Sequence, residues 1–263
     1  MEIIGYILSV VIGITLGLIG GGGSILTVPI LVYLFAVPAA EATSYSLFIV
    51  GLTAAVGAFR HFRLGNLNLK TAFSFAIPSL VSLLLIRQFL LPNIPQQLFL
   101  MGTVLVTKDV LIMVVFAFLM IAASISMIKN NKSAVDEVNP STSRLVIIGL
   151  FVGVITGFLG AGGGFLIIPA LLFFAGLSMK KAVGTSLLII AINSLLGFIG
   201  DATAENFSID YSFLFIISGL AVAGMFIGTK LSTKIDGAKL KPAFGWFVLI
   251  MGAYIIAKEL LIS

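Results

Sequence analysis

The chain has 263 residues, of which 60% are hydrophobic and only 10% are charged, and its formal net charge is +5. Soluble domains carry roughly 25% charged residues, and a mean hydropathy of +1.23 leaves too much apolar surface for one core to hide. This composition excludes a soluble globular protein and predicts a polytopic integral membrane protein. The positive charge fits the Lys and Arg of cytoplasmic loops, so it does not indicate a nucleic-acid partner.

Residue types that are absent or rare narrow the possible chemistry further. The chain has no cysteine, which excludes disulfides and thiolate metal sites. Its single histidine, His61, lies in a basic loop where we expect a solvated side chain. No Asp or Glu lies at the centre of a predicted span, so the sequence offers no carboxylate relay for protons or cations. We therefore expect no metal site, no cofactor and no catalytic residue.

The first apolar segment, residues 3–19, runs into a stretch rich in glycine. Glu2 is the only charge before this segment and no small-residue cleavage site follows it, so we expect a retained helix and not a signal peptide. Residues 17–23 read GLIGGGG, and a second apolar segment, 24–37, follows. Because glycine weakens helices, the pattern predicts a helical hairpin that is broken inside the membrane.

Longer apolar segments follow the hairpin at 40–59, 71–90 and 110–128. Each is long enough to cross a bilayer as a helix. Arg87 and Lys108 are basic residues near the ends of these segments, and we interpret them as side chains that snorkel toward water. A role in drawing anions to the outer mouth is the less favoured alternative.

The second half of the chain repeats the first. A shift of 140 residues aligns the two halves without a gap. The matched positions include Gly13 and Gly153, Gly17 and Gly157, Gly20 and Gly160, Gly22 and Gly162, Gly23 and Gly163, Pro29 and Pro169, and Ser46 and Ser186. A shared pattern of glycines and a proline indicates internal duplication.

The duplication gives the domain organisation. The second copy has apolar segments at 145–159, 165–177, 182–199 and 211–228, and a last segment, 243–261, closes the chain. We expect an all-α polytopic membrane protein of about ten hydrophobic segments in two repeats. The first repeat with its connecting helix spans 1–128, a cytoplasmic linker spans 129–143, and the second repeat spans 144–263.

The loops after the third segment of each copy carry opposite charges. The loop RHFRLGNLNLK at 60–70 is basic, whereas its counterpart, GDATAENFSID at 200–210, is acidic. Because basic loops stay in the cytoplasm, the two loops are expected on opposite sides of the membrane, which makes the repeats inverted. This orientation places both termini outside the cytoplasm, and we expect a multi-pass protein of the cell (inner) membrane.

The two glycine runs are the strongest candidates for a binding site. One hairpin enters from each side, so the two tips are expected to overlap near the midplane, where irregular backbone is tolerated only if it lines a cavity or is covered by protein. The first amides of the returning half-helices lack helical partners and carry the positive end of the helix dipole. Two such ends that face each other predict an anion site that needs no charged side chain.

Hydroxyl groups near the tips could complete the coordination of an oxyanion, or bond to their own helices instead. Ser46 and Ser186 match in register, and Thr185 precedes the second. The candidate substrate-binding residues are therefore Gly20, Gly21, Gly22, Gly23, Ser24, Ser46, Gly160, Gly162, Gly163, Gly164, Thr185 and Ser186.

Other small or polar residues in the spans favour helix packing. Gly13–Gly17 and Gly153–Gly157 are GxxxG pairs, which bring helices close together. Asn193 lies in the middle of a predicted helix, and we interpret it as an interhelical hydrogen-bonding residue.

At these motifs the sequence resembles the TauE/SafE family of sulfite exporters. The pattern GxxxGxxGxGG…P occurs at 13–29 and again at 153–169, and AVGTSL occurs at 182–187, where the first copy reads ATSYSL. The resemblance spans essentially the whole chain and implies transport of sulfite or a related organosulfur anion. It maps the glycine motifs of the family onto Gly20, Gly22, Gly23, Gly160, Gly162 and Gly163.

The sequence and the resemblance together predict a transporter that exports a small oxyanion by alternating access between its halves. An anion channel built on the same amides is the alternative. An intramembrane hydrolase is a remote one, because a serine nucleophile needs a base and the single histidine is expected in a loop. We expect a small inorganic or organosulfur anion and the lipid bilayer as partners, no nucleic acid and no enzymatic activity; the oligomeric state stays open.

Overall fold

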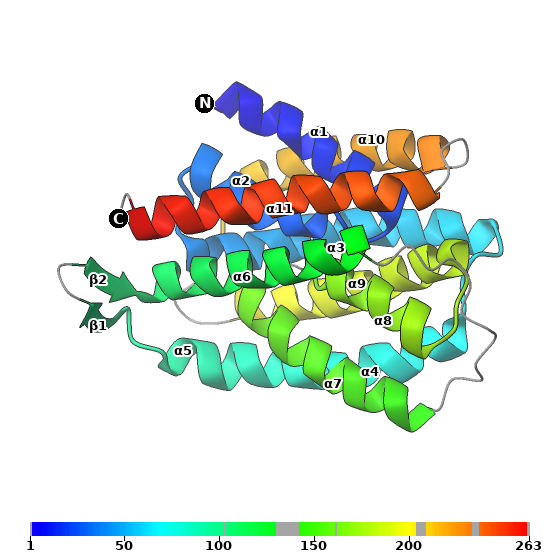
Figure 1. The fold of residues 1–263 in the computed structure, drawn as a ribbon, viewed down its shortest axis with the longest axis horizontal. Helices are drawn as coiled ribbons and strands as arrows, with labels where there is room; N and C mark the ends of the chain where they lie inside the picture. The colour runs from blue at the N-terminus through cyan, green and yellow to red at the C-terminus, as the bar shows by residue number, and fades with distance from the viewer. Residues whose placement is uncertain are drawn as a thin grey trace.

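The chain folds into a bundle of helices, most of which lie roughly along one direction (Figure 1). The computed structural model describes residues 2–101, 104–129, 142–160, 162–203, 209–232 and 237–261. The expected linker at 129–143 lies almost wholly outside the described residues, as do parts of the two polar loops around 204–208 and 233–236.

The first repeat consists of α1 (Glu2–Ile19), α2 (Ser24–Leu34), α3 (Ala39–Arg63) and α4 (Leu69–Leu85). Its last helix continues through a π-helical turn, η1 (Ile86–Leu90), and one further helical turn, α5 (Leu91–Asn93). Two antiparallel strands, β1 (Gln97–Met101) and β2 (Val104–Thr107), then precede α6 (Lys108–Lys129). The strands were not expected, but β-branched residues in this connection favour extended backbone.

The second repeat follows the same order. It consists of α7 (Thr142–Leu159), α8 (Gly164–Phe174), α9 (Met179–Ala202) and α10 (Tyr211–Ser232), and α11 (Gly237–Leu261) closes the chain. The returning helices α2 and α8 have 11 residues each, which is about 16 Å of helix, or about half of the hydrocarbon thickness of a bilayer.

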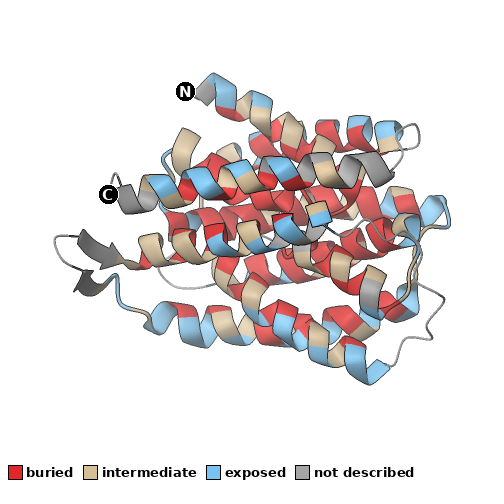
Figure 2. Ribbon diagram, viewed as in Figure 1, coloured by how far each residue is buried: buried red, intermediate tan, exposed pale blue. Residues whose placement is uncertain are grey.

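Helix packing repeats in the way that the duplication predicts. The helices α3 and α9 pack against each other in the most buried part of the bundle (Figure 2). On one side α1 packs on α10, and the equivalent pair, α7 and α4, packs on the other, while α6 packs on α11. This two-fold pattern and the helical content confirm the predicted all-α polytopic fold with inverted repeats.

The GxxxG pairs lie where helices approach most closely, as predicted. A Cβ added to Gly13 of α1 would lie 1.7 Å from the carbonyl oxygen of Ala221 on α10. A Cβ added to Gly153 of α7 would lie 2.1 Å from the carbonyl oxygen of Ser79 on α4. Only glycine allows this separation, so these positions serve helix packing and not ligand binding.

The outer surface of the bundle suits a membrane. Five helical stretches in the described chain are long and apolar enough to span a bilayer, namely Ala39–Arg63, Leu69–Asn93, Thr142–Leu159, Met179–Ala202 and Tyr211–Ser232. Large apolar side chains such as those of Ile77, Phe151 and Phe215 are exposed on them, as expected for contact with lipid. The start of α1, the end of α11 and the β1–β2 hairpin lie at the same end of the bundle (Figure 1).

Candidate functional site

The first helix stops where the glycine run begins. Residues 20–23, which we call the first break, separate α1 from α2 and are all buried. Gly20 has a φ angle of +81°, a conformation that glycine adopts readily because it has no Cβ. The Ser24 hydroxyl donates a hydrogen bond to the Gly21 carbonyl at 2.7 Å, which ties the start of α2 to the break.

The second break, residues 160–163, separates α7 from α8 in the same way. Gly160, Gly162 and Gly163 have φ angles of +63°, +63° and +67°. Any side chain at these three positions would be strained, so the glycines are required by the backbone itself. The amide of Gly160 still donates to the carbonyl of Thr156 at 2.9 Å, as the last hydrogen bond of α7.

The two breaks touch each other inside the bundle. A Cβ added to Gly21 would lie 2.4 Å from the carbonyl oxygen of Gly164, and one added to Gly164 would lie 2.4 Å from the Cα of Gly21. Gly162 lies beside Val50 and Ser194, which belong to the middle of α3 and α9. The backbones of the two repeats therefore meet near the centre of the bundle, with no space for a side chain between them.

Four further glycines of the breaks, Gly20, Gly23, Gly160 and Gly163, contact helices. Gly20 packs against Val183 of α9, and Gly160 packs against Thr43 of α3, so each break rests on a helix of the other repeat. Gly23 packs on its own hairpin helix, where an added Cβ would lie 2.1 Å from the Ile12 carbonyl oxygen. Gly163 packs on α7 in the equivalent way, against Thr156.

Both returning helices begin at the contact between the breaks. In the described chain, the first amide of α2 with a backbone acceptor is that of Leu26, which donates to Gly23 at 3.1 Å. The corresponding amide of α8 is that of Leu166, which donates to Gly163 at 2.9 Å. The first amides of a helix have no acceptor within that helix, and both helix dipoles point their positive ends at the same region.

The candidate hydroxyl groups differ in their partners. The Ser186 hydroxyl makes hydrogen bonds to the carbonyls of Gly20 and Val183, both at 2.8 Å, so it supports the first break. The equivalent Ser46 hydroxyl is fully buried and has no hydrogen-bond partner among the described residues, and neither has that of Ser194 beside Gly162. Thr185 faces away from the breaks, because its hydroxyl accepts from the backbone amide of Asn68 at 3.0 Å.

Asn193 makes the interhelical contact that the sequence suggested. Its side-chain amide donates to the Ser79 hydroxyl of α4 at 2.6 Å, while its carbonyl oxygen has no partner within the described chain. This contact joins α9 to the helix that packs on α7, and thus helps to hold the second hairpin in place.

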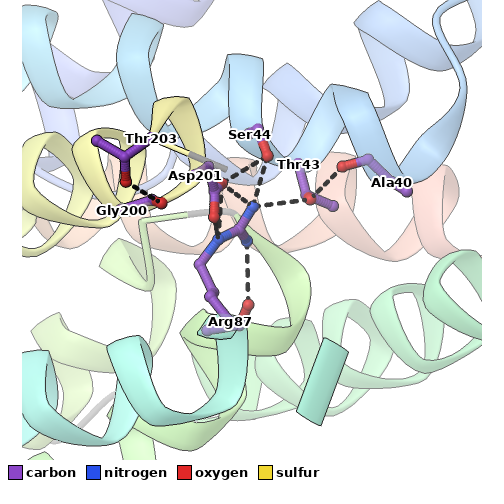
Figure 3. A network of polar contacts seen from close by, with 8 residues as sticks. Ala40, Thr43, Ser44, Arg87, Gly200, Asp201 and Thr203 are labelled. Carbon is purple, nitrogen blue, oxygen red and sulfur yellow. Dashed lines mark hydrogen bonds and ion pairs between the residues drawn. The ribbon is translucent and has the colours of Figure 1, made fainter. Parts of the chain in front are cut away.

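Arg87 does not snorkel, which corrects the sequence-based interpretation. Only 2% of its side chain is exposed, and its guanidinium forms an ion pair with Asp201 at the end of α9 (Figure 3). It also donates to the carbonyl of Gly157 at 3.1 Å and to the Ser44 hydroxyl at 2.7 Å. The π-helical turn at 86–90 carries this side chain, and such turns occur frequently at functional sites.

We call Thr43, Ser44, Arg87 and Asp201 the Arg87 cluster. It joins α3 and α4 of the first repeat to α7 and α9 of the second. Ser44 donates to the Asp201 carboxylate at 2.5 Å, and Thr43 is the residue on which Gly160 rests. A buried positive charge with its counter-ion therefore lies beside the second break.

Lys108 and His61 also differ from expectation. The Lys108 ammonium group donates to the Leu91 carbonyl at 2.5 Å and the residue is buried, so it does not reach water. His61 is only 5% exposed, and neither ring nitrogen has a hydrogen-bond partner in the part of the chain that the structure describes, so it is not a solvated loop residue. The predictions of a snorkelling Lys108 and a solvated His61 were both wrong because the helices are longer than the apolar segments. The helix α3 ends at Arg63, and α6 begins at Lys108.

The sequence contained one signal for the Arg87 cluster. The predicted topology puts Arg87 and the loop that begins at Asp201 at the same outer end, so opposite charges were available to pair. Basic and acidic residues at the same membrane face are common, however, and their partner in space depends on how α4 and α9 pack. The π-helical turn that orients Arg87 has no signature in a single sequence.

Comparison with known proteins identifies the kind of protein that carries this site. The model of the family described as Sulfite exporter TauE/SafE matches residues 6–255. The chain belongs to the TauE/SafE family. The resemblance seen in the glycine motifs is thus confirmed over nearly the whole chain.

Curated relatives in the TauE/SafE family agree with a role in transport. A probable membrane transporter protein of Xylella fastidiosa (strain Temecula1) is 28% identical over 253 residues, which cover 93% of this chain and 91% of the relative. The probable membrane transporter protein YdhB of Bacillus subtilis is 29% identical over 240 residues, which cover 88% and 91%. No solved structure matches the chain. The chain is therefore a multi-pass membrane transporter.

Proposed function

We propose that this transporter exports a small oxyanion, sulfite or a related organosulfur anion, and holds it with backbone amides at the two glycine breaks. The observation that carries the proposal is the contact between Gly21 and Gly164, where the starts of α2 and α8 meet inside the bundle. A helix start in a partly buried setting stabilises a negative charge by up to ~2 kcal/mol, and here two starts act on one place. The family description, sulfite exporter, supports this class of substrate.

The direct contact between the breaks favours a carrier over a channel. Because no side chain fits between Gly21 and Gly164, an anion can enter only after the two backbones separate. The breaks belong to different repeats, so a small movement of one hairpin relative to the other opens the place from one side. Such rocking of two inverted repeats around a central site is the usual form of alternating access.

Export is energetically favourable without a further driving ion. A membrane potential that is negative in the cytoplasm favours exit of an anion by about 2.3 kcal/mol per charge per 100 mV. The Arg87 cluster adds no net charge to the site, because the guanidinium is already paired with Asp201. The amides can thus bind an anion and release it again, which a strong unpaired positive charge would hinder.

Sulfite release from lipid vesicles tests the proposal. Purified protein is reconstituted into vesicles loaded with sodium sulfite, and external sulfite is followed over time beside protein-free vesicles. We expect faster release from the protein-containing vesicles, slowed by external organosulfonates and unaffected when only the cation is changed. Equal release from both vesicle populations would rule out the proposed function. A rate per protein far above about 10⁶ per second would identify a channel instead, because carrier steps take microseconds or longer.

A further inference from the structure

The internal duplication relates His61 to Asp201. The same shift of 140 residues that aligns the glycine runs places His61 of α3 at the position of Asp201 on α9, and Gly184 at the position of Ser44. In space the correspondence also holds, because Ser44 donates to Asp201, and an added Cβ on Gly184 would lie 3.0 Å from the Cβ of His61. The two positions lie at opposite ends of the antiparallel pair α3 and α9.

Each of these positions contacts a helix residue that directly follows a contact of one of the breaks. Thr43, on which Gly160 rests, precedes Ser44 of the Arg87 cluster. Val183, on which Gly20 rests, likewise precedes Gly184, the contact of His61. His61 and Asp201 are therefore each linked to one break through two consecutive residues of the facing helix.

Asp201 and His61 differ in their hydrogen-bond partners. At the second break Asp201 is paired with Arg87 and Ser44. At the first break the place of the serine is taken by Gly184, and the place of the arginine by Ile227, which points outward and is 52% exposed. Neither substitute can hydrogen-bond a side chain. His61 is buried, and both its ring nitrogens are without a partner among the residues that the structure describes.

The surroundings of His61 offer no carboxylate in the described chain. The charged side chain that acts on it is Arg60, whose guanidinium donates to the Phe226 carbonyl of α10 at 3.3 Å. Burial and this positive charge both disfavour the imidazolium, so the ring gains a proton only together with an anion. From α9 the contact is a glycine, and the carbonyl of Asn66 covers that glycine from the loop. Lys181 and Lys230 are exposed. Buried polar groups are almost always hydrogen-bonded, so we expect the His61 imidazole to have a partner from outside the chain. Because the imidazole can bind a proton, an anion is a suitable partner.

We propose that His61, as its imidazolium, binds the transported anion at the end of the pathway beside the first break. The imidazole takes a proton from water, its N–H donates to an oxyanion oxygen, and the proton returns to water when the anion leaves. This inference rests on the proposed function and adds to it a side chain that binds the substrate. The two repeats then differ in function. Arg87 and Asp201 form a permanent ion pair at one end of the α3–α9 pair, whereas His61 forms an ion pair at the other end only while the anion is bound.

The single histidine of the chain makes a direct test possible. Full-length protein with ¹⁵N-labelled histidine has one imidazole, and its nitrogen resonances are followed at pH 6 while sodium sulfite is added. We expect them to move to the positions of a hydrogen-bonded imidazolium as sulfite saturates. Unmoved resonances in protein that sulfite stabilises against thermal unfolding would overturn the inference.

A pair of variants gives the second readout. Sulfite affinity is measured at pH 6 and pH 8 for wild type, for His61→Gln, and for Arg63→Gln as a control that removes an exposed charge from the same helix end. Because sulfite itself takes up a proton in this range, the ratio of the two affinities is compared between proteins. We expect the affinity at pH 6 divided by the affinity at pH 8 to be about tenfold larger in wild type and in Arg63→Gln than in His61→Gln.

The outcomes separate the two proposals. Equal ratios in wild type and His61→Gln, with sulfite transported by both, would overturn the role of His61 alone. A wild-type protein that neither binds nor releases sulfite would overturn the proposed function and this inference with it. The resonance experiment needs no substitution, so it decides the question even if His61→Gln does not fold.

Discussion

Ser46 and Ser186 differ in their hydrogen bonds although the duplication makes their positions equivalent. They occupy equivalent positions on α3 and α9, and both are fully buried. The Ser186 hydroxyl donates to the Gly20 carbonyl of the first break at 2.8 Å, whereas the Ser46 hydroxyl has no partner in the described ranges of the chain. A buried hydroxyl without a partner destabilises a fold, so its presence fits a side chain that completes its hydrogen bond with a ligand.

Replacing the two serines should therefore give opposite results. Ser46→Ala removes no hydrogen bond and should leave the melting temperature unchanged or slightly higher, while sulfite affinity falls about tenfold with the loss of a charged hydrogen bond. Ser186→Ala should destabilise the protein by about 1 kcal/mol through the loss of the bond to Gly20. Thermal unfolding in detergent with and without sulfite measures both effects. A normal sulfite response in Ser46→Ala would remove this serine from the site.

The ion pair between Arg87 and Asp201 gives a second prediction at the residue scale. The guanidinium is nearly inaccessible and the carboxylate side chain is 13% exposed. Removing one partner therefore leaves the other as an unpaired, buried charge between helices. We expect Arg87→Gln to cost about 3 kcal/mol, and the double variant Arg87→Gln with Asp201→Asn to recover most of that loss. Thermal unfolding of the two single variants and the double variant measures the coupling. Additive losses would show that the pair is not coupled, and Arg63→Gln serves as the neutral control.

At the scale of helices, close approach of backbones holds the two outer pairs together. The pairs α1–α10 and α7–α4 each meet at a GxxxG motif, and these positions leave no room for a methyl group. In lipid there is no hydrophobic drive to bring such helices together, so van der Waals contact between their backbones supplies the attraction. Moving α1 away from α10 also moves the first break, because the break begins where α1 ends.

Substitutions along α1 and α10 test this packing. Gly13→Ala puts a Cβ 1.7 Å from the Ala221 carbonyl oxygen and should destabilise the protein by ~1–3 kcal/mol. Gly219→Ala on α10 meets no atom within 4 Å and should leave stability unchanged. The yield of monodisperse protein and its melting temperature compare the two variants. A well-behaved Gly13→Ala protein would contradict the close packing of α1 on α10.

The helices also show which parts of the structure a sequence of this kind determines. The breaks were predictable because GLIGGGG and its repeat forbid a continuous helix. The burial of Arg87 was not, since it depends on a π-helical turn and on the packing of α4 against α9. His61 was assigned to a loop because its neighbours are basic, yet α3 continues to Arg63 and the residue faces α9. Periodicity and composition predict segments, whereas partners across the bundle depend on tertiary packing.

At the scale of the whole molecule, orientation in the membrane can be tested from its two ends. The loop that follows α3 and the turn that ends α5 lie at opposite ends of the bundle (Figure 1), and Leu64 and Asn93 are exposed there. Because the chain has no cysteine, Leu64→Cys and Asn93→Cys each introduce a single thiol. We expect an impermeant thiol reagent added to intact cells to label Asn93→Cys alone, since basic loops stay in the cytoplasm. Labelling of Leu64→Cys alone would reverse the proposed orientation.

The central claim is that the anion passes between two breaks that must separate, and one comparison of rates tests it most directly. Gly21→Ala places a methyl group 2.4 Å from the Gly164 carbonyl oxygen, whereas Gly219→Ala places one in open space. Sulfite release is measured from vesicles that carry equal amounts of each folded variant. We predict that Gly219→Ala releases sulfite at the wild-type rate and that Gly21→Ala releases it at least about tenfold more slowly, because one misplaced group at the binding point costs 1.4 kcal/mol or more. Folded Gly21→Ala protein that releases sulfite as fast as wild type would contradict the account.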